Sequence, residues 1–115
     1  MCTGISSWAD AFCVYNFSDI DMKFLEIKGG SAFGRFDEDV EPGAHKCCNW
    51  KNKSCNNQGK RDSNLIFKVG SILNNGFGGT TLGKVYCDNV NIKAGGWLVI
   101  KGKNGHYYCE AGYNP

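Results

Sequence analysis

Alternating hydrophobic and polar positions dominate this chain and predict β-strands. A period of two residues is typical of a strand whose successive side chains point to opposite faces of a sheet. Six segments follow this pattern or are rich in β-branched and aromatic residues: CVYNF (13–17), DMKFLEIKG (21–29), NLIFKVGSI (64–72), KVYCDNVNI (84–92), WLVIKG (97–102) and HYYCEAGY (106–113). In the second segment Met22, Phe24 and Glu26 share one face. The alternation there is imperfect, so we expect both faces to be partly covered.

Glycine and asparagine mark the ends of these segments. The chain contains 16 glycines, and the Asn-Gly dipeptides at 75–76 and 104–105 are typical of tight hairpin turns. The second dipeptide predicts a hairpin between WLVIKG and HYYCE. The phrase VEPGAHKCC (40–48) indicates an aliphatic residue, a turn and then a further strand.

Helical patterns are weak throughout the chain. No segment carries a 3.6-residue apolar stripe longer than two turns, and the best helical candidate is SSWADAF (6–12). Short strands about ten residues apart, joined by glycine-rich turns, are typical of sandwiches and barrels. We therefore predict an all-β protein. It would be a single antiparallel β-sandwich domain over residues 1–115, stapled by disulfides, with 1–11 as a flexible or weakly helical N-terminal segment.

Seven cysteines are spread along the 115 residues, a density typical of extracellular disulfide frameworks rather than of the reducing cytosol. We expect six of them to pair and Cys2, near the terminus, to stay unpaired. Cys47 and Cys48 point to opposite faces if their segment is extended, so they should bond to different partners. The six candidates, among which about 15 connectivities are possible, are Cys13, Cys47, Cys48, Cys55, Cys87 and Cys109.

Composition narrows the compartment and the partners. The net charge of +2 is mild, so we expect no nucleic-acid partner. No apolar run approaches the length of a membrane-spanning helix. The first twelve residues show neither the basic start nor the long apolar stretch of a signal peptide. The cysteines favour a secreted protein, with the cytosol as the alternative.

Metal and redox chemistry fit the cysteine spacing poorly. Cys47, Cys48 and Cys55, with His45 just before them, offer soft ligands for zinc. Adjacent cysteines do not easily aim both sulfurs at one ion, and the second pair of ligands that zinc sites usually have is missing. A C-x-x-C redox pair is absent. We expect no metal and no cofactor.

Acid–base catalysis is the rival from another functional class. His45 and His106 are the only histidines, and either could act as a general base beside Glu110 or Asp88. Such a small secreted hydrolase of the nuclease type would use a cation for the phosphate, for which the candidates are Arg35 and Arg61. No sequence motif ties these residues together, which favours two surface histidines beside turns.

The acidic run FDEDVE (36–41) could bind calcium. Its spacing is not that of an EF-hand loop, and we expect a solvated loop instead.

A basic stretch around Trp50 is the best candidate for binding. Lysines and an arginine with an interleaved aromatic residue suit phosphates, anionic headgroups or a glycan. The alternative for Trp50 is a core residue packed on a disulfide, with the lysines extending from its edge. One tyrosine on the last strand would contribute to this site. Adjacent side chains on a strand point to opposite faces, so only one of the two neighbouring tyrosines should face outward. The predicted binding residues are Trp50, Lys51, Lys53, Lys60, Arg61, Tyr107 and Tyr108.

The stretch KCCNWKNKSCNNQGKRDS (46–63) is best interpreted as a disulfide-stapled basic loop that leads into the strand LIFKV. A staple holds a loop in one shape and reduces the entropy that the loop loses on binding. The sequence therefore favours a non-enzymatic recognition protein over an enzyme. The partner would be a membrane lipid, a glycan or a cell-surface protein, and the oligomeric state stays open.

Residues 13–70 resemble the first part of the aegerolysins, which are small β-sandwich proteins. The segment VYNFSDIDMKFLEIKGGSAFGRFDED contains Phe33-Gly34-Arg35-Phe36 where the family has a W-G-K/R-F phrase, and VEPGAHKCC is similar to its aliphatic-x-P-G turn. SCNNQGKRDSNLIFKV is similar to its cysteine-bearing stretch before a strand. The chain differs in its shorter length, its many cysteines and a later phrase, Tyr86-Cys87-Asp88-Asn89, that lacks the family's prolines and tryptophans.

The resemblance implies a non-enzymatic protein that recognises membrane lipids and can require a partner to form pores. The functional class would be a secreted toxin, effector or defence protein. A cysteine-rich effector or defence protein with the same sandwich, but with a glycan or protein target, is the alternative.

Overall fold

The structure is a computed structural model that describes residues 11–115. Within this range the chain is all-β, and alternation along the sequence accounts for most of its strands. The eight strands are β1 (Ala11–Ser18), β2 (Met22–Lys28), β3 (Asp37–Val40), β4 (His45–Asn49), β5 (Asn64–Asn74), β6 (Thr80–Lys93), β7 (Trp97–Lys103) and β8 (His106–Gly112).

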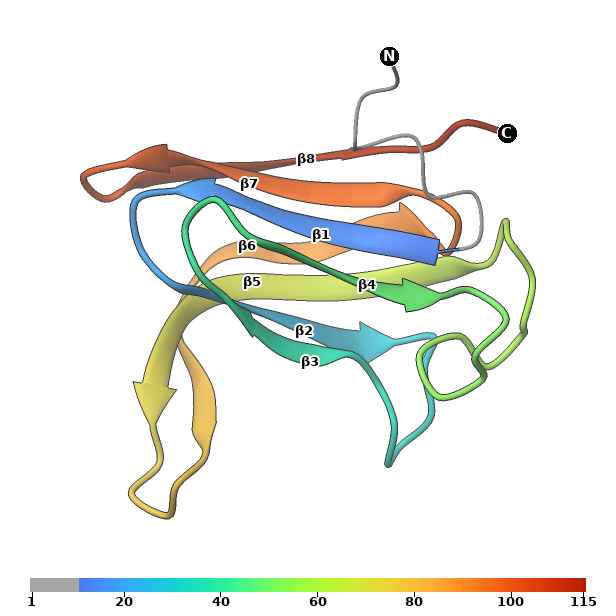
Figure 1. The fold of residues 1–115 in the computed structure, drawn as a ribbon, viewed down its shortest axis with the longest axis horizontal. Coiled ribbons are helices and arrows are strands. Elements are labelled where there is room, and N and C mark those ends of the chain that lie inside the picture. Colours follow the sequence, from blue (N-terminus) through green and yellow to red (C-terminus); the bar gives the residue numbers. More distant parts are fainter. Residues whose placement is uncertain (1–10) are drawn as a thin grey trace.

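The strands form two four-stranded sheets that pack as a sandwich (Figure 1). One sheet has the order β4-β1-β7-β8 and the other has the order β3-β2-β5-β6. The predicted β-sandwich is thus confirmed. The predicted β7–β8 hairpin is also present, and Asn104 and Gly105 at its tip both have positive φ, as a tight hairpin turn requires.

One pairing in the first sheet is parallel. β1 and β7 run side by side in the same direction, from the pair Cys13 and Trp97 to the pair Ser18 and Gly102. All other neighbouring strands are antiparallel. A hairpin turn makes two consecutive strands antiparallel. In the sequence, strands β2 to β6 lie between β1 and β7, so no local turn sets the relative direction of this pair.

The core lies between the two sheets and is closed at one end by three aromatic rings. The ring centroid of Phe12 lies 5.1 Å from that of Phe36 and 5.7 Å from that of Phe67. The rings are tilted or edge-on to one another, which are arrangements that aromatic pairs prefer. The fully buried side chains around them include Val14, Met22, Phe24, Leu65, Val69, Leu98 and Ile100. This core joins the two sheets, and a second, smaller cluster contains Cys13, Tyr15 and Val99.

Six cysteines pair, as the sequence predicts. Cys13–Cys47 joins the neighbouring strands β1 and β4, and Cys48–Cys55 joins β4 to the loop after it. Cys87–Cys109 links the two sheets, because β6 belongs to one and β8 to the other. Adjacent Cys47 and Cys48 therefore do have different partners, while Cys2 lies outside the described residues. Three disulfides in a domain of this size are consistent with an extracellular location.

The acidic run 36–41 is not a solvated loop, contrary to the prediction. Its central residues form the edge strand β3, which pairs with β2. Lys23 of β2 is 3% exposed, and its Nζ lies 2.6 Å from Asp37 Oδ1 and 2.9 Å from Asp39 Oδ1. The carboxylates can enter a strand because this buried ammonium neutralises them. The burial of both Lys23 and its neighbour Phe24 also shows that both faces of β2 are covered, as expected.

The helical candidate at 6–12 is contradicted where it can be seen. Ala11 and Phe12 begin β1, and Phe12 is completely buried in the core. The rest of that segment lies outside the described residues.

Candidate functional site

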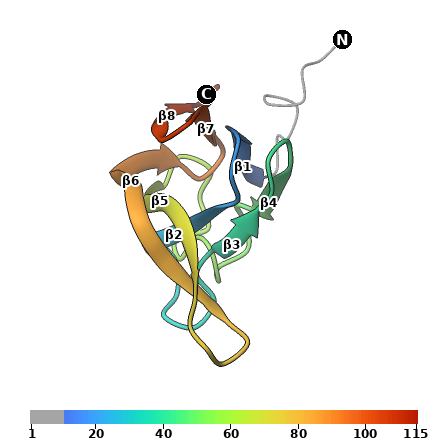
Figure 2. The ribbon, with the colours of Figure 1, turned by 90° about the vertical axis from the view of Figure 1, so that its left-hand side faces the viewer.

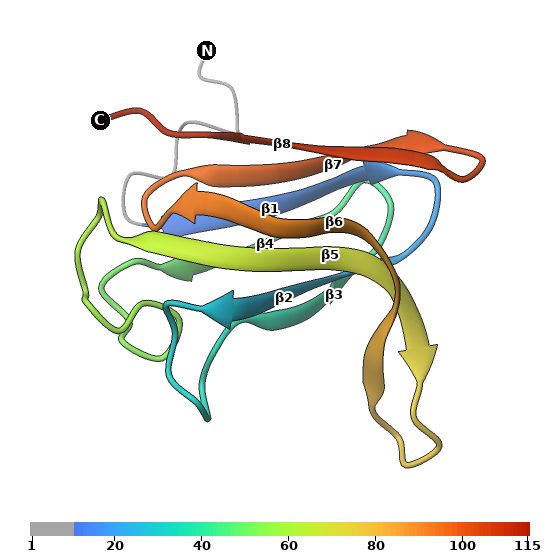
Figure 3. The same ribbon diagram turned by 180° about the vertical axis from the view of Figure 1, so that it is seen from behind.

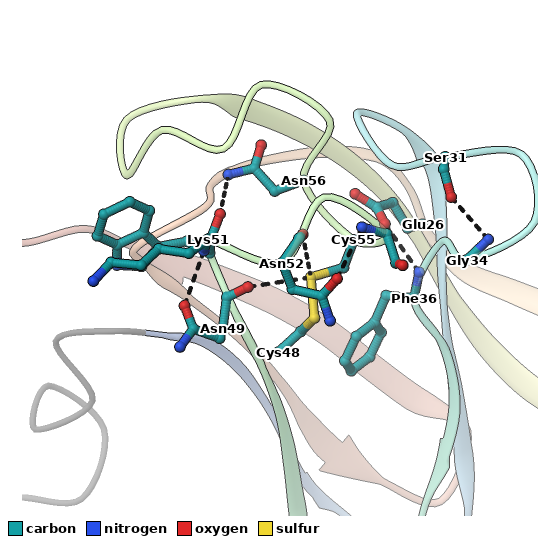
Figure 4. The surroundings of a disulfide bond; sticks show 12 residues. Glu26, Ser31, Gly34, Phe36, Cys48, Asn49, Lys51, Asn52, Cys55 and Asn56 are labelled. Carbon is teal, nitrogen blue, oxygen red and sulfur yellow. Dashed lines mark hydrogen bonds between the residues drawn. A yellow bond between two sulfur atoms is a disulfide. The ribbon is translucent and has the colours of Figure 1, made fainter.

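The stapled loop, residues 50–63, follows β4 and is shaped by its asparagines (Figure 4). Asn49 Oδ1 accepts a hydrogen bond from the Lys51 backbone N–H at 2.9 Å, and Asn52 Oδ1 accepts one from the Ser54 N–H at 2.9 Å. Such local bonds are why asparagine favours turns. The Cys48–Cys55 disulfide closes the segment across a sequence separation of 7. The predicted disulfide-stapled loop is confirmed.

Asn56 fastens the two halves of the stapled loop. Its side chain is completely buried, and its Nδ2 donates to the carbonyl oxygens of Trp50 at 2.8 Å and of Lys60 at 2.9 Å. A buried amide that bonds two distant carbonyls fixes the path of the chain between them. The basic residues of this loop therefore stand on a rigid backbone.

A second loop, residues 29–36 between β2 and β3, lies against the stapled loop; we call it the Phe33 loop. The Ser31 N–H donates to the Ser54 carbonyl at 2.9 Å, and the Asn57 N–H donates to the Gly29 carbonyl at 2.7 Å. Gly34 packs so closely that a Cβ there would lie 2.6 Å from Ser54 Cβ. The two loops, with Lys28 at the end of β2, form one surface at this end of the sandwich, which we call the basic end (28–36 and 50–63).

Glu26 lies buried beneath the basic end. Its side chain is completely buried, and its Oε1 accepts the Phe36 backbone N–H at 2.9 Å. Burial raises the pKa of Glu26 to about 7, against the opposing effects of the Phe36 N–H and the Arg35 charge. Figure 4 shows this carboxyl between the Phe33 loop and the disulfide. The protonation of Glu26 thus changes near neutral pH, directly under the Phe33 loop.

Positive charge is concentrated at the basic end. Residues 28–36 and 50–63 carry six cations and one carboxylate, a net charge of +5, whereas the whole chain carries +2. The remaining residues are therefore net negative. Opposite signs at separate regions orient a protein toward an anionic partner. The six cations are Lys28, Arg35, Lys51, Lys53, Lys60 and Arg61.

Phe33 stands fully exposed at the basic end, with a side-chain exposure of 104%. Sequence reasoning did not select it as a binding residue. The available signal was its setting, because a phenylalanine in the Gly- and Ser-rich segment GGSAFG has no strand to pack in. An exposed aromatic ring on a loop that also carries Arg35 and lies against the cationic stapled loop is a distinctive surface feature of this loop pair.

Trp50 takes an intermediate position between the two predicted alternatives. Its ring is partly buried and packs against the core, while Lys51 Nζ lies 5.3 Å from the ring centroid. This distance is within the range of a cation–π contact. Trp50 thus both anchors the loop and positions the Lys51 ammonium, and Lys51, Lys53 and Lys60 are exposed beside it.

Arg61 belongs to the same loop but is held by the C-terminal tail. Its guanidinium lies 5.0 Å from the ring centroid of Tyr113, and its Nη1 donates to the Tyr113 hydroxyl at 3.2 Å. A second nitrogen, Nη2, donates to the Asn114 carbonyl. These contacts fix the cation beside the loop.

Tyr107 and Tyr108 are not brought to the basic end. They begin β8 next to the β7–β8 hairpin tip, at the opposite end of the sandwich from the stapled loop (Figure 1). The Tyr107 hydroxyl donates to Asp19 Oδ1 at 2.6 Å, and its ring packs on Tyr86. Tyr108 is the outward-facing one, with 54% exposure. Five of the seven predicted binding residues therefore share one loop, and two lie far from it.

The histidines of the hydrolase alternative lie on different strands. His45 is exposed on β4, where its ring stacks on Tyr15 at 5.3 Å, and His106 is exposed at the start of β8. The two carboxylates proposed as their partners contact lysines instead. Glu110 lies 2.7 Å from Lys101 Nζ.

The other carboxylate, Asp88, lies 3.7 Å from Lys68 Nζ. The geometry offers the hydrolase hypothesis no support at these positions. Within residues 11–115, no cluster of three or more His, Cys, Asp or Glu side chains has the arrangement of a metal site.

A pocket of about 400 Å³ opens beside the stapled loop and the ends of β2 and β5. Its polar lining consists mainly of amides, which can both donate and accept hydrogen bonds. Such a lining suits hydroxyl or phosphate oxygens. The amide residues are Asn56, Asn57, Gln58 and Asn64, with Lys28 beside them.

Comparisons of the chain with protein-family models, with curated proteins and with solved structures gave no significant match. Among the described residues, no helix has the length and apolar character needed to cross a lipid bilayer.

Proposed function

We propose that this protein is a secreted, non-enzymatic recognition protein that binds an anionic membrane surface through its basic end. The observation that carries the proposal is Phe33, which is 104% exposed on a loop fastened to a cationic, disulfide-stapled loop. An aromatic ring can enter the interfacial region of a bilayer while the surrounding cations meet anionic headgroups. The biological class would be the toxin, effector or defence type that the aegerolysin resemblance implies.

The electrostatic contribution to such binding is large enough to matter. A lysine or arginine near an anionic leaflet contributes about 1 kcal/mol, and this attraction falls off within a Debye length. A net charge of +5 at the basic end can therefore hold the protein at the surface, where a single aromatic side chain alone would give weak attachment. The staple and Asn56 supply the preorganisation that reduces the entropy lost on binding.

The pocket beside the stapled loop supports the same proposal. The exposed amides of Asn57, Gln58 and Asn64, with Lys28, offer donors to the phosphate and hydroxyl oxygens of a headgroup, at the side of the Phe33 loop. The Asn56 amide does not, because both of its N–H groups already bond carbonyls of the stapled loop. Headgroup contacts of this kind would add selectivity among anionic lipids, since charge attraction alone distinguishes only net charge.

The test is sedimentation of the oxidised protein with vesicles of phosphatidylcholine alone and of phosphatidylcholine with phosphatidylserine. We expect binding to the anionic vesicles that weakens as salt is raised. Lys53→Glu should reduce this binding by about thirtyfold, because it replaces one attractive charge by a repulsive one near the surface.

Lys103→Glu is the matched control. It makes the same charge change at an exposed lysine beside the β7–β8 hairpin tip, remote from the basic end. Equal losses of binding in the two variants would show that only net charge matters, and would contradict a site at the basic end. Absence of binding to every vesicle composition would reject the proposal and leave a glycan or a protein as the partner to test.

A further inference from the structure

The β5–β6 hairpin leaves the sandwich and forms a separate two-stranded arm, residues 71–83 (Figures 1 and 3). Gly70 is the last β5 residue that pairs with β2, and beyond it β5 pairs only with β6. Three register shifts fall between Phe67 and Ile72. Bulges of this kind bend a strand and increase its twist, which explains why the arm turns away from the sheet.

Gly70 makes the bend possible. A Cβ at this position would lie 2.2 Å from the Lys84 carbonyl oxygen, a backbone atom of the partner strand. Near the tip of the arm, where Thr80 pairs with Asn74, the Thr80 hydroxyl donates to Asp39 Oδ2 at 2.8 Å and so ties the arm to β3. The direction of the arm is therefore built into the fold.

The tip of the arm is ordered and presents one aromatic ring. Asn75 Oδ1 accepts the backbone N–H of Phe77 at 2.8 Å and of Gly79 at 3.2 Å. Gly76 and Gly78 both have positive φ, a conformation that glycine adopts without a steric cost. Between these two glycines Phe77 is 92% exposed. The turn holds this ring in solvent, where no intramolecular packing explains it.

The arm carries no charge. Residues 69–83 contain no Asp, Glu, Lys or Arg, although 21% of the chain is charged. Leu73 is also 57% exposed. Apolar side chains on an uncharged hairpin can enter a bilayer interface without desolvating an ion. A stable protein interface, by contrast, usually involves about 20–30 residues on each partner, more than this narrow arm contains.

The arm tip and the Phe33 loop point to the same side of the molecule. Figures 1 and 2 show both segments projecting at the bottom of the view, away from β8. One flat surface can therefore touch both. We propose that the arm is a second lipid-contacting element, with Phe77 entering the interface of the same bilayer that the basic end binds; this inference rests on the proposed function.

Fluorescence with vesicles containing brominated phosphatidylcholine tests the arm. Phe77→Trp should show a blue-shifted emission on binding to phosphatidylserine-containing vesicles and quenching by the brominated lipid. Tyr108→Trp is the control, since Tyr108 is exposed on β8, on the other side of the molecule. The wild type, with its three tryptophans, gives the reference signal. Phe77→Ser should lower the vesicle partition coefficient by about tenfold, as expected for losing most of one buried aromatic side chain.

The outcomes separate this inference from the proposed function. If the protein sediments with anionic vesicles but the Phe77→Trp emission does not change, the arm inference is overturned and the proposed function stands. If no vesicle binds the protein, both are rejected. If the wild type is a dimer in solution and Phe77→Ser makes it monomeric without changing vesicle binding, the arm joins copies of the chain, and the inference is overturned.

Discussion

The basic end and the arm each present one exposed phenylalanine, but they hold it by different physical means. At the basic end a disulfide, a buried amide and bonds between two loops hold the loop that carries Phe33 against the cationic stapled loop. In the arm, glycine conformations and one asparagine side chain fix Phe77 on an uncharged hairpin. The long polar loop is thus held in shape by a disulfide and by side-chain hydrogen bonds. A short hairpin obtains its order from backbone geometry and a few side-chain hydrogen bonds.

The largest effect of a single substitution on stability is expected at the bend of the arm. Gly70→Val would place a side chain against the Lys84 carbonyl, and the clash should lower the free energy of unfolding by about 3 kcal/mol. Thr81→Val adds the same residue on the exposed surface of the arm and should change it by about 0.5 kcal/mol or less. Chemical denaturation measures both. Equal stability of the two variants would show that β5 and β6 can separate freely at the bend.

Removing the staple should affect only the basic end. Cys48→Ser with Cys55→Ser opens a short loop and should lower the free energy of unfolding by about 2.5 kcal/mol. We expect weaker vesicle binding at a temperature where the protein is still folded, because the lysines lose their fixed positions.

The control for this variant is Cys87→Ser with Cys109→Ser. This bridge spans a sequence separation of 22, so its loss should lower stability by about 3.4 kcal/mol while vesicle binding by the folded protein is retained. Loss of binding in both double variants would indicate a general effect of instability rather than a role for the staple.

A change of pH should affect the basic end and not the arm. Glu26 lies under the basic end, whereas the arm has no titratable group. Burial raises the folded-state pKa of Glu26 from 4.5 to about 7, so the native state binds more protons than the unfolded state between these values. Stability contributed by this group is therefore lost as pH rises from about 4.5 to about 7. Glu26→Gln should flatten this loss, by about 2 kcal/mol between pH 5 and pH 8.

Denaturation of the wild type and Glu26→Gln across that pH range provides the measurement. Lys23 and Asp39 do not confound it, since their ion pair keeps the pKa of Lys23 raised and that of Asp39 lowered, despite the opposing effect of burial on each. Parallel pH profiles for the two proteins would contradict a raised pKa for Glu26.

The smallest effect is expected where the stapled loop meets the C-terminal tail. Tyr113→Phe keeps the ring under the Arg61 guanidinium but removes the hydroxyl that accepts its hydrogen bond. The loss in stability should be about 0.5–1 kcal/mol, and vesicle binding should stay within a factor of two. Denaturation and sedimentation together check this. A large loss of vesicle binding would show that the tail orders the whole basic end.

Local patterns along the chain were sufficient to predict most of the architecture. Alternation identified six of the eight strands, because a strand with one buried face requires a period of two. The opposite directions of adjacent Cys47 and Cys48 also followed from strand geometry, and the structure gives them different partners. The acidic edge strand β3 was missed because the charge that permits it, on Lys23, comes from another strand.

The binding residues show the same limit. Five of the seven lie together because they are neighbours in one loop, whereas Tyr107 and Tyr108 were grouped with them by residue type and lie at the other end. Phe33 and Phe77 were not selected, since exposure of an apolar side chain depends on which segments come to lie around it.

The fold class, the set of six paired cysteines and the stapled basic loop thus follow from the sequence, because alternation, turn residues and strand geometry act over a few neighbouring positions. The sequence left the disulfide connectivity open, and the structure supplied it. Tertiary structure was needed for the parallel pairing of β1 and β7, the burial of Glu26 beneath the Phe33 loop and the common side to which the Phe33 loop and the arm project. These features arise from contacts between residues far apart in the chain. Their energies depend on close packing in three dimensions, for which the linear pattern carries no local signal.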